Sequence, residues 1–510
     1  MLVHEFLERS AHAVPRKVAL IFEDQRVTYH DLDAMANRLA NALVDRGIER
    51  GDRVIVYMPN SVESVVSIFG ILKAGGAFVV INPTTKGEKL RYYLHDCSAR
   101  GIIADENHEA LVRGIVPNVP SITFGVFGSL RGDSHGHGGT PHASFGSIQN
   151  EYPPTLPRVP LADSDLACLV YTSGSTGEPK GVVERHKNID FVTTSITSYL
   201  ENVPDDIVVN VLPFSFDYGL YQPLMVFKFG GTLVLERSFA YPVSVLRTME
   251  SEGVTGFPGV PTLFSILLKM DLSRYNLSKL RYITNTADFL PVSHVQRLRT
   301  LFPWVRLYSM YGQTECKRVL YLPPEKVDQY PDSVGIAIPG TEVWLEDSNG
   351  HRLGPNSLGE LVVRGPHVMG GYWNSPELTA QRFYPSSVPG EFVLHTGDLF
   401  QMDSHGLLYF ISRQDDIIKT RGEKVAPKEI ENVLYRLPGV KEAAVIGVPD
   451  PVLGQALKAF IATDHGELQA SDVILHCKKY LEDLMVPQSI EFRTELPKNP
   501  SGKILRQRLV

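Results

Sequence analysis

Residues 171–181 read Tyr-Thr-Ser-Gly-Ser-Thr-Gly-Glu-Pro-Lys-Gly, and an apolar run, Leu166 to Val170, leads into them. The glycines allow close backbone approach and positive φ, the hydroxyls add hydrogen-bond donors, and Lys180 adds a positive charge. A flexible Ser/Gly linker is the alternative, but the lysine and the strand-like run argue against it. The segment therefore predicts a loop that binds phosphate oxygens. Its predicted contacts are Thr172, Ser173, Gly174, Ser175, Thr176, Gly177 and Lys180.

This loop does not fit the G-x-x-x-x-G-K-[ST] pattern of a P-loop. It resembles, residue for residue, the signature loop of the adenylate-forming superfamily, which includes acyl-CoA synthetases, adenylation domains of nonribosomal peptide synthetases and luciferases. The resemblance spans nearly the whole chain. It implies an enzyme that uses ATP and Mg²⁺ to form an acyl adenylate with release of pyrophosphate, and then passes the acyl group to a phosphopantetheine thiol.

Composition agrees with a large soluble enzyme. A chain of 510 residues, 43% hydrophobic and 21% charged, can bury more than one core and is expected to divide into domains. The net charge of −7 gives no general attraction to nucleic acid. The four cysteines are widely spaced, so we expect neither a zinc site nor disulfides, and a reducing cytosol fits best. We find no apolar stretch of about 18 residues, and expect neither a transmembrane segment nor a secretory signal.

Short runs rich in β-branched residues alternate with helical patterns. Buried strands are predicted at 53–58, 77–81, 101–104, 207–212 and 231–235. Helices are predicted at 29–46, with Thr28 as N-cap, and at 62–73 and 243–252. This alternation predicts an α/β fold whose large N-terminal domain has layered β-sheets and helices. The stretch 125–155, rich in Gly, Ser, His and Pro, is interpreted as a surface insertion.

A domain boundary is predicted in the charged stretch Arg413-Gln414-Asp415-Asp416. After it, patterns at 427–437, 442–448 and 473–483 fit a compact α+β unit of about 95 residues, a usual domain size. We therefore predict an N-terminal AMP-binding domain at 1–413 and a small C-terminal domain at 414–510. The resemblance implies a hinge at Asp415, about which the small domain moves between the two half-reactions. A charged linker without function is the alternative.

The segment Tyr311-Gly312-Gln313-Thr314-Glu315 follows a strand-like run and offers an aromatic face, a hydroxyl and a carboxylate. In the resembled family the tyrosine stacks on adenine, the threonine contacts phosphate and the glutamate helps to hold Mg²⁺. The resemblance therefore implies nucleotide contacts at Tyr311 and Gly312, catalytic roles for Thr314 and Glu315, and a metal ligand at Glu315. A surface turn with an acidic end is the alternative.

Two further segments complete the predicted nucleotide site. The resemblance implies that Asp398, on a Thr-Gly-Asp turn, accepts hydrogen bonds from both ribose hydroxyls and that Arg413 accompanies it. The run Thr284-Asn285-Thr286-Ala287-Asp288 departs from the Gly-Gly-Ala or Gly-Ser-Ala run that many relatives carry beside adenine. Its bulkier side chains leave less room for close backbone approach. We assign Asn285 and Asp288 to the nucleotide site, with Asp288 as an acceptor for the exocyclic amine.

Near the C-terminus, Pro497-Lys498-Asn499-Pro500-Ser501-Gly502-Lys503-Ile504 resembles the terminal motif that presents the family's catalytic lysine. A carboxylate that attacks a phosphate brings two anions together, so a positioned ammonium lowers the barrier by electrostatic stabilisation. We therefore predict Lys503 as catalytic for adenylation. A solvated lysine near the chain end is the alternative from these residues alone.

The run Leu212 to Gly219 begins the acyl pocket in the resembled family. Many acyl-CoA synthetases carry a histidine at the position of Phe216, whereas Phe216-Asp217 resembles the pair in amino acid adenylation domains, whose aspartate pairs with the substrate ammonium. A carboxylate beside an apolar pocket is costly unless it finds a cation, so we predict that Asp217 binds an amino or imino acid. An aspartate that caps a local turn is the alternative. Other predicted pocket residues are Tyr218, Tyr221, Met310 and Arg318.

Lys317 and Arg318 have two interpretations: they bind a second carboxylate or a carrier phosphate, or they are charges at the surface or behind the residues that contact the substrate. For the whole enzyme we favour a small amino or imino acid loaded onto a separate carrier protein. A short- or medium-chain acyl-CoA synthetase that uses CoA as its thiol acceptor is the second hypothesis. A nucleotide-binding protein that has lost catalysis is the third, although the retained Lys503, Glu315 and Asp398 argue against it.

Overall fold

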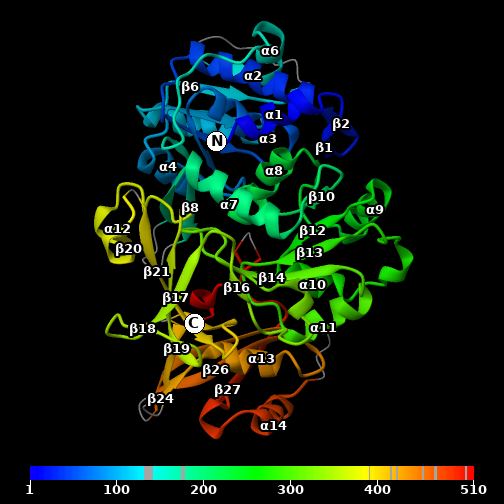
Figure 1. Ribbon diagram of the computed structural model, residues 1–510, viewed down its shortest axis with the longest axis vertical. Helices are drawn as coiled ribbons and strands as arrows, with labels where there is room; N and C mark the ends of the chain where they lie inside the picture. Colours follow the sequence, from blue (N-terminus) through cyan, green and yellow to red (C-terminus); the bar gives the residue numbers. More distant parts are fainter. Residues whose placement is uncertain are drawn as a thin grey trace.

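The computed structural model describes residues 1–130, 142–173, 179–389, 391–413, 416–420, 423–450, 453–463, 468–499 and 502–509. Within these ranges the strands form four sheets, of which the three larger ones precede residue 414. Figure 1 shows the chain running from the blue N-terminal elements at the top to the orange and red C-terminal elements at the bottom. The predicted hinge residue, Asp415, lies outside the described residues.

Two mostly parallel sheets hold the N-terminal elements. One has the order β16 (Ile336–Ala337), β15 (Leu320–Tyr321), β14 (Arg306–Tyr311), β13 (Tyr282–Asn285), β12 (Gly256–Gly259), β10 (Ile207–Asn210), β11 (Thr232–Leu235), β1 (Val18–Phe22) and β2 (Gln25–Thr28). The other has the order β7 (His142–Ser144), β6 (Phe124–Phe127), β5 (Gly101–Ala104), β3 (Arg53–Tyr57), β4 (Ala77–Val80), β8 (Leu166–Ser173) and β9 (Pro179–Arg185). The five predicted strands are confirmed, each with bounds within two residues of the prediction.

Helices cover these sheets, as the alternating patterns predicted. The α-helices of the N-terminal region are α1 (Glu5–Ala13), α2 (Tyr29–Asp45), α3 (Val62–Lys73), α4 (Gly87–Asp96), α5 (Glu106–Ile115), α6 (Phe145–Glu151), α7 (His186–Tyr199), α8 (Asp217–Phe229), α9 (Pro242–Glu252), α10 (Pro261–Leu267), α11 (Val292–Leu301) and α12 (Pro376–Arg382). Short 3-10 helices lie at η1 (Val116–Asn118), η2 (Leu272–Arg274) and η3 (Pro324–Lys326). The predicted cap is confirmed, because the Thr28 hydroxyl accepts a hydrogen bond from the Asp31 N–H at 3.2 Å.

A continuous apolar core joins the two sheets. Helices α3 and α8 are buried on nearly every face, and the rings of Phe69 and Phe227 lie 5.6 Å apart between them. Such aromatic pairs add to the stability that the buried area supplies. The rigid layer formed in this way holds β13, β14 and the start of α8, which carry many of the predicted site residues.

The third and fourth sheets follow in the chain. The third is antiparallel, with β18 (Arg352–Leu353), β17 (Glu342–Glu346), β19 (Ser357–Arg364), β21 (Phe392–Met402), β20 (Phe383–Pro385) and β22 (Leu408–Arg413). The fourth comprises β24 (Glu423–Val425), β23 (Ile418–Thr420), β26 (Gly454–Thr463), β25 (Val440–Asp450) and β27 (Ser489–Arg493), with α13 (Pro427–Leu434), α14 (Ala470–Tyr480), η5 (Asp483–Met485) and η6 (Arg506–Arg508).

The fourth sheet has hydrophobic cores of its own. Ile430 of α13 and Cys477 of α14 pack in one cluster with Val445 and Leu457 of the sheet. A unit with its own core can move as a body, which agrees with the predicted small C-terminal domain. In Figure 1 the red chain end turns back from this lower unit toward the middle of the molecule.

The interpretation of residues 125–155 as a surface insertion is wrong for most of its described part. Strands β6 and β7 extend the second sheet, and Phe145 and Ile148 of α6 are buried in the core. The small and polar composition hid these elements, because the few apolar residues alternate with Gly and Ser. Residues 131–141 lie outside the described ranges.

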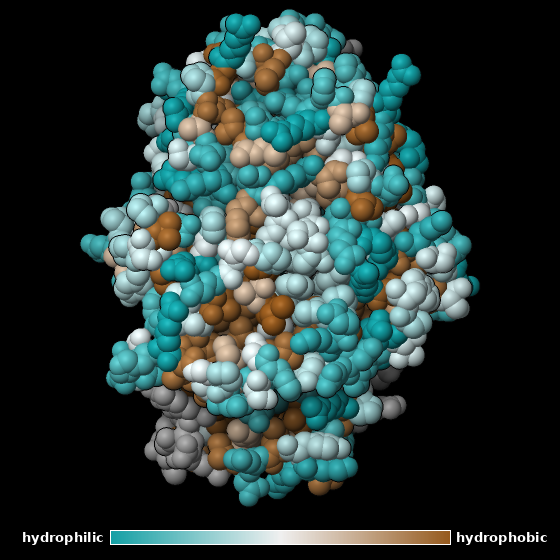
Figure 2. Space-filling model, viewed as in Figure 1, coloured by the Kyte–Doolittle hydropathy of each residue, from teal (hydrophilic) through white to brown (hydrophobic). Residues whose placement is uncertain are grey.

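On the face shown in Figure 2, hydrophobic residues are exposed in scattered groups among hydrophilic ones. Within the described ranges, we find no helix whose length and apolar character would let it cross a membrane.

Candidate active site

A cleft lies where the C-terminal unit meets the N-terminal sheets. Its walls come from the loop after β13, the end of β14, the strands β21 and β22, and the start of α13. Eight predicted site residues line it: Asn285, Asp288, Met310, Tyr311, Gly312, Asp398, Arg413 and Lys503. Residues far apart in the chain are therefore brought to one place.

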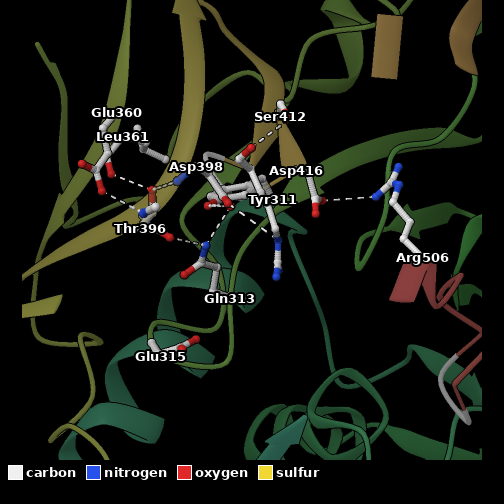
Figure 3. A network of polar contacts seen from close by, with 12 residues as sticks. Tyr311, Gln313, Glu315, Glu360, Leu361, Thr396, Asp398, Ser412, Asp416 and Arg506 are labelled. Carbon is white, nitrogen blue, oxygen red and sulfur yellow. Dashed lines mark hydrogen bonds and ion pairs between the residues drawn. The ribbon is translucent and has the colours of Figure 1, made fainter. Parts of the chain in front are cut away.

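Asp398 lies at one wall of the cleft and is 3% exposed. Its Oδ2 accepts hydrogen bonds from the Tyr311 hydroxyl at 2.6 Å and from Gln313 Nε2 at 2.7 Å, as Figure 3 shows. Its Oδ1 lies 3.8 Å from Arg413 Nε. Burial raises the pKa of Asp398, and the Arg413 charge opposes that rise. This carboxylate is thus held in place by protein donors on one oxygen.

The turn that carries Asp398 is fixed from the neighbouring strand. The Thr396 hydroxyl donates to the Leu361 carbonyl at 2.7 Å, and the Gly397 N–H donates to Glu360 Oε1 at 2.8 Å (Figure 3). Gly397 has φ of 70°, a conformation that favours glycine. The Thr-Gly-Asp sequence therefore aims the carboxylate at the cleft.

Tyr311 packs its ring among aromatic residues. The Phe400 ring packs edge to face against it, with 4.8 Å between the ring centres. Phe410, which also lines the cleft, lies nearly parallel to it, with 6.2 Å between the ring centres. These contacts fix the ring beside the cleft wall.

The loop between β13 and α11 offers unpaired polar atoms to the cleft. Among the described residues, Asn285 Oδ1 and Thr286 Oγ1 are buried without a hydrogen-bond partner. Ala287, the next residue, has φ of 77°, which is unusual for a residue other than glycine. Buried polar atoms without partners are costly, so this loop fits a ligand that supplies donors and acceptors, such as a nucleotide base.

Asp288 lines the cleft and also contacts the C-terminal unit. Its Oδ1 accepts a hydrogen bond from the Phe289 N–H at 2.8 Å and lies 3.1 Å from Nζ of Lys428, the second residue of α13. Burial raises the pKa of Asp288, but the charges of Lys428, Lys503 and Arg506 outweigh it and hold the pKa well below its usual range. The carboxylate therefore joins the two domains through Oδ1, and its contact with the exocyclic amine stays a prediction.

Lys503 enters the cleft from a tight turn. Its N–H donates to Asn499 Oδ1 at 2.8 Å, and Gly502 has φ of 84°. A Cβ at Gly502 would lie 2.6 Å from the Thr262 hydroxyl of α10, so only glycine allows this approach to the N-terminal domain. Burial and the charge of Arg413 lower the pKa of Lys503 to about 8.

The segment after Lys503 is anchored to α13. Arg506 donates from Nη2 to both oxygens of Glu431 at 2.8 Å, and its Nη1 lies 3.4 Å from Asp416. Charge-assisted hydrogen bonds from one nitrogen to both carboxylate oxygens hold this guanidinium against α13. Figure 3 shows the Asp416 contact beside the Asp398 network.

Glu315, the predicted metal ligand, is held through its Oε1. The Tyr372 hydroxyl donates to it at 2.5 Å and Arg382 Nη1 at 2.8 Å. Arg382 of α12 also donates from Nη2 to Gln313 Oε1 at 2.7 Å and to the Thr396 carbonyl at 2.6 Å. One arginine therefore connects the segment after β14 with the Asp398 turn.

The predicted phosphate loop is described only at its two ends. Thr172 on β8 pairs with Lys180 on β9, and Lys180 Nζ lies 5.7 Å from the centre of the Tyr372 ring. This places the base of the hairpin beside the residue that contacts Glu315. Gly174, Ser175, Thr176 and Gly177 lie outside the described residues, as does the side chain of Ser173.

A second group of charges lies at the start of α8. Asp217 Oδ2 accepts a hydrogen bond from the Thr314 hydroxyl at 3.0 Å and lies 3.4 Å from Lys317 Nζ. Lys317, 4% exposed, also forms an ion pair with the fully buried Glu184 of β9. Glu184 Oε2 accepts a hydrogen bond from the Tyr221 hydroxyl at 2.8 Å. Lys317 thus lies between two carboxylates.

These contacts bear on two expectations. Burial raises the pKa of Asp217, but the charges of Lys317 and Arg318 outweigh it and lower the pKa, so the chain itself supplies cations near this carboxylate. The pairing of Asp217 with a substrate ammonium stays a prediction. Lys317 and Arg318 are not surface charges, because both are buried.

The tight turn before Lys317 explains its inward position. Lys317 has φ of 56°, and a Cβ at Gly312 would lie 1.6 Å from the Lys317 carbonyl oxygen. The turn therefore requires glycine at position 312. Gly312 serves the backbone here, in addition to lining the cleft.

Tyr218 and Arg318 lie next to this group. The Arg318 guanidinium carbon is 4.6 Å from the centre of the Tyr218 ring, and the Tyr218 hydroxyl donates to the Thr284 carbonyl at 3.0 Å. Met310 Sδ accepts a hydrogen bond from the Tyr199 hydroxyl at 2.9 Å. The predicted pocket residues Tyr218 and Met310 thus lie near the C-terminal ends of β13 and β14.

Four residues of the site had no role in the sequence interpretation. Gln313 lies inside the recognised motif, but its position between two functional residues gives no signal of its contact with Asp398. Glu184, Tyr372 and Arg382 reach the site only through folding. The one local signal is the closeness of Glu184 to the phosphate loop.

Comparison with known proteins gives consistent matches. A family model described as AMP-binding enzyme matches residues 7–373, and one described as AMP-binding enzyme C-terminal domain matches residues 429–503. A long-chain-fatty-acid–CoA ligase of Bacillus subtilis (strain 168) is 31% identical, over 100% of this chain and 94% of that protein.

Gramicidin S synthase 2 of Brevibacillus brevis is 30% identical over 99% of this chain, which covers 11% of that protein. Among solved structures, an anthranilate CoA ligase in complex with anthranoyl-AMP superimposes with a TM-score of 0.91 at 28% identity. That match covers 100% of this chain and 96% of the other. The fold, with its large N-terminal region and smaller C-terminal unit, is thus the one found in adenylate-forming enzymes.

Proposed function

The chain belongs to the AMP-binding enzyme family, and we propose that it is an ATP-dependent ligase that joins a small carboxylic acid to CoA through an acyl adenylate. One observation carries this proposal. Lys503, from the C-terminal domain, shares a single cleft with Asp398, Arg413 and Asn285 of the N-terminal domain. The cleft combines groups suited to a ribose, a base and a developing phosphate charge.

In the proposed first step, a carboxylate oxygen of the acid attacks the α-phosphorus of ATP and the bond to the β-phosphate breaks. Acyl-AMP and pyrophosphate are the products. The Lys503 ammonium opposes the repulsion between the carboxylate and the α-phosphate. Asp398 accepts the ribose hydroxyls, and Tyr311 and Gln313 hold that carboxylate in place.

Thr314 is positioned for phosphate by Asp217, to which its hydroxyl donates at 3.0 Å. Glu315 fits a magnesium ion as an oxygen ligand, because Tyr372 and Arg382 both contact Oε1 and fix the carboxylate. Magnesium, when bound, would neutralise part of the triphosphate charge.

In the proposed second step, the thiolate of CoA attacks the acyl carbonyl carbon and AMP leaves. CoA is favoured as acceptor because the long-chain-fatty-acid–CoA ligase matches this chain over nearly the full length of both proteins. The gramicidin synthase match keeps carrier-protein loading as the second candidate. Its amino acid substrate has less support, since Asp217 already lies 3.4 Å from Lys317 Nζ, a cation that it shares with Glu184.

Acid-dependent exchange of labelled pyrophosphate into ATP tests the proposal, with a panel of short aliphatic and aryl acids and with amino acids. The wild-type protein is expected to exchange with at least one acid. Lys503→Ala should reduce that rate by about 100-fold or more, because one positioned donor to a developing charge is worth that much. Lys478→Ala, at an exposed position on α14, is the control.

Exchange without any acid, or exchange by Lys503→Ala at the control rate, would refute the proposal. Exchange confined to amino acids would favour the carrier-loading alternative.

A further inference from the structure

Arg318 is a buried arginine with few protein contacts. It is 7% exposed, its Nε has no hydrogen-bond partner among the described residues, and its Nη1 donates to the Lys317 carbonyl at a long 3.4 Å. A guanidinium has five N–H donors. Within the described part of the chain, no carboxylate lies within ion-pair distance of it.

The neighbouring lysine is in the opposite situation. Lys317 forms ion pairs with both Glu184 and Asp217, so its ammonium already has carboxylate partners inside the protein. Asp217 lowers the cost of burying Arg318 only from a distance, because no ion pair joins them. The two adjacent cations therefore have different tasks, and Arg318 is the one with donors to spare.

Arg318 lies beside residues that the sequence predicts for the acyl pocket. Its guanidinium lies over the Tyr218 ring, and Tyr218 is tied to Thr284, the residue before the cleft-lining Asn285. Burial raises the pKa of Tyr199, and the nearby Arg318 charge opposes that rise. Tyr199 in turn contacts Met310, which lines the cleft. Arg318 thus lies against Tyr218 and near Tyr199, the residue that contacts Met310.

A purely structural role explains this poorly. The contact with an aromatic ring supplies only part of the free energy lost when a guanidinium leaves water. A buried charge is normally paired and hydrogen-bonded, and removal of one partner is strongly destabilising. A ligand anion at this place would complete the set of contacts, and a carboxylate matches the forked geometry of arginine.

We propose that Arg318 binds a second carboxylate of the acid substrate, so that the enzyme activates dicarboxylic acids. This inference rests on the proposed function and specifies its substrate class. The pocket polarity is then the reverse of the one predicted from Asp217. A substrate ammonium would meet a buried cation, whereas a distal carboxylate would meet unused donors.

The experiment uses the full-length protein and two matched series of acids. The first contains pentanoate, glutarate and 5-aminopentanoate, and the second contains benzoate, benzene-1,3-dicarboxylate and 3-aminobenzoate. The readout is kcat/KM for the acid in ATP–pyrophosphate exchange. The variants are Arg318→Met, which keeps length without charge, Arg318→Lys, and the control Arg274→Met at an exposed position.

In at least one series the dicarboxylate is expected to exceed both analogues by about tenfold or more, since a site built to hydrogen-bond a substrate group rejects analogues that lack it. Arg318→Met should bring the ratio of dicarboxylate to monocarboxylate close to one. Arg318→Lys should recover only part of the preference. Thermal unfolding of each variant checks that the fold is intact.

Monocarboxylates or amino acids that match or exceed the dicarboxylates would overturn the inference, as would a preference unchanged in Arg318→Met. The proposed function would survive either result. If no acid supports exchange, the proposed function fails, and calorimetric titration of the same acids into wild-type and Arg318→Met protein without ATP still decides whether Arg318 binds the second carboxylate of a dicarboxylic acid.

Discussion

The two ends of the active-site region treat buried charge in opposite ways. At the nucleotide end, Asp398 and Lys503 line an open cleft, and burial displaces the pKa of each toward its neutral form. At the acyl end, Asp217 and Lys317 contact each other and have the pKa shifts of charged groups that are paired. The nucleotide end thus keeps charges ready for a ligand, whereas the acyl end uses most of its charges for its own structure.

This difference separates two kinds of residue. Side chains whose charge is left for a ligand to pair with can be replaced with little loss of stability but with a large loss of activity, as is common at functional sites. Groups that neutralise each other are expected to matter mainly for folding. Four substitutions or conditions test the division.

Lys317→Met is expected to give the largest effect, and at the acyl end. It would leave Glu184 and Asp217 buried without their shared cation, which should lower the free energy of unfolding by about 3–5 kcal/mol. Chemical denaturation measures this loss. Adding Glu184→Gln to the same variant should recover part of it, and a loss below about 1 kcal/mol would show that the pair is not a structural unit.

Asp398→Asn should have the reverse profile. Loss of a charged acceptor for the ribose is expected to raise KM for ATP by about 10- to 100-fold, the worth of one or two charged hydrogen bonds. Burial raises the pKa of Asp398, so folding disfavours its charge, and the neutral amide should leave stability equal or higher. A destabilised variant with normal KM for ATP would contradict the proposed assignment.

The pH dependence of adenylation tests the same end. Lys503 has its pKa lowered to about 8, and its ammonium is the active form. As pH rises through this value the charge is lost, so kcat/KM for ATP should fall about tenfold per unit above pH 8. A profile that stays flat to about pH 10, the usual range for lysine, would contradict the role of a buried lysine.

Lys428→Ala is expected to give the smallest effect. The ion pair between Lys428 and Asp288 joins α13 to the nucleotide end, and a partly exposed pair is worth about 1 kcal/mol. Adenylation should slow by about fivefold, while transfer from a synthetic acyl-AMP to CoA keeps its rate. Lys458→Ala, which breaks the ion pair with Glu491 inside the C-terminal sheet, is the control. If both variants slow adenylation equally, the contact between Asp288 and Lys428 does not contribute to adenylation.

The sequence predicted the nucleotide end better than the acyl end for a physical reason. ATP has fixed chemistry, so its contacts recur as local motifs, and Asp398, Arg413 and Lys503 indeed line one cleft. The strands at 53–58 and 101–104 were readable because buried parallel strands have continuous apolar runs.

The acyl end could not be predicted in this way. Lys317 forms an ion pair with Glu184, and Glu184 lies on β9, a strand of a different sheet. No spacing in the sequence relates the two residues. The pairing of Asp217 with a substrate ammonium therefore stays a prediction, and nothing in the sequence indicated that Lys317 supplies a cation from within the chain.

The most direct test of the proposed function is to identify the nucleotide product when the acid and ATP are mixed with magnesium and CoA is left out. Rapid acid quench and mass spectrometry should detect an acyl-AMP, with one pyrophosphate for each adenylate and no ADP. Formation of ADP and phosphate, or AMP without an acyl adenylate in the presence of an acid that supports exchange, would contradict the proposed acyl-adenylate mechanism.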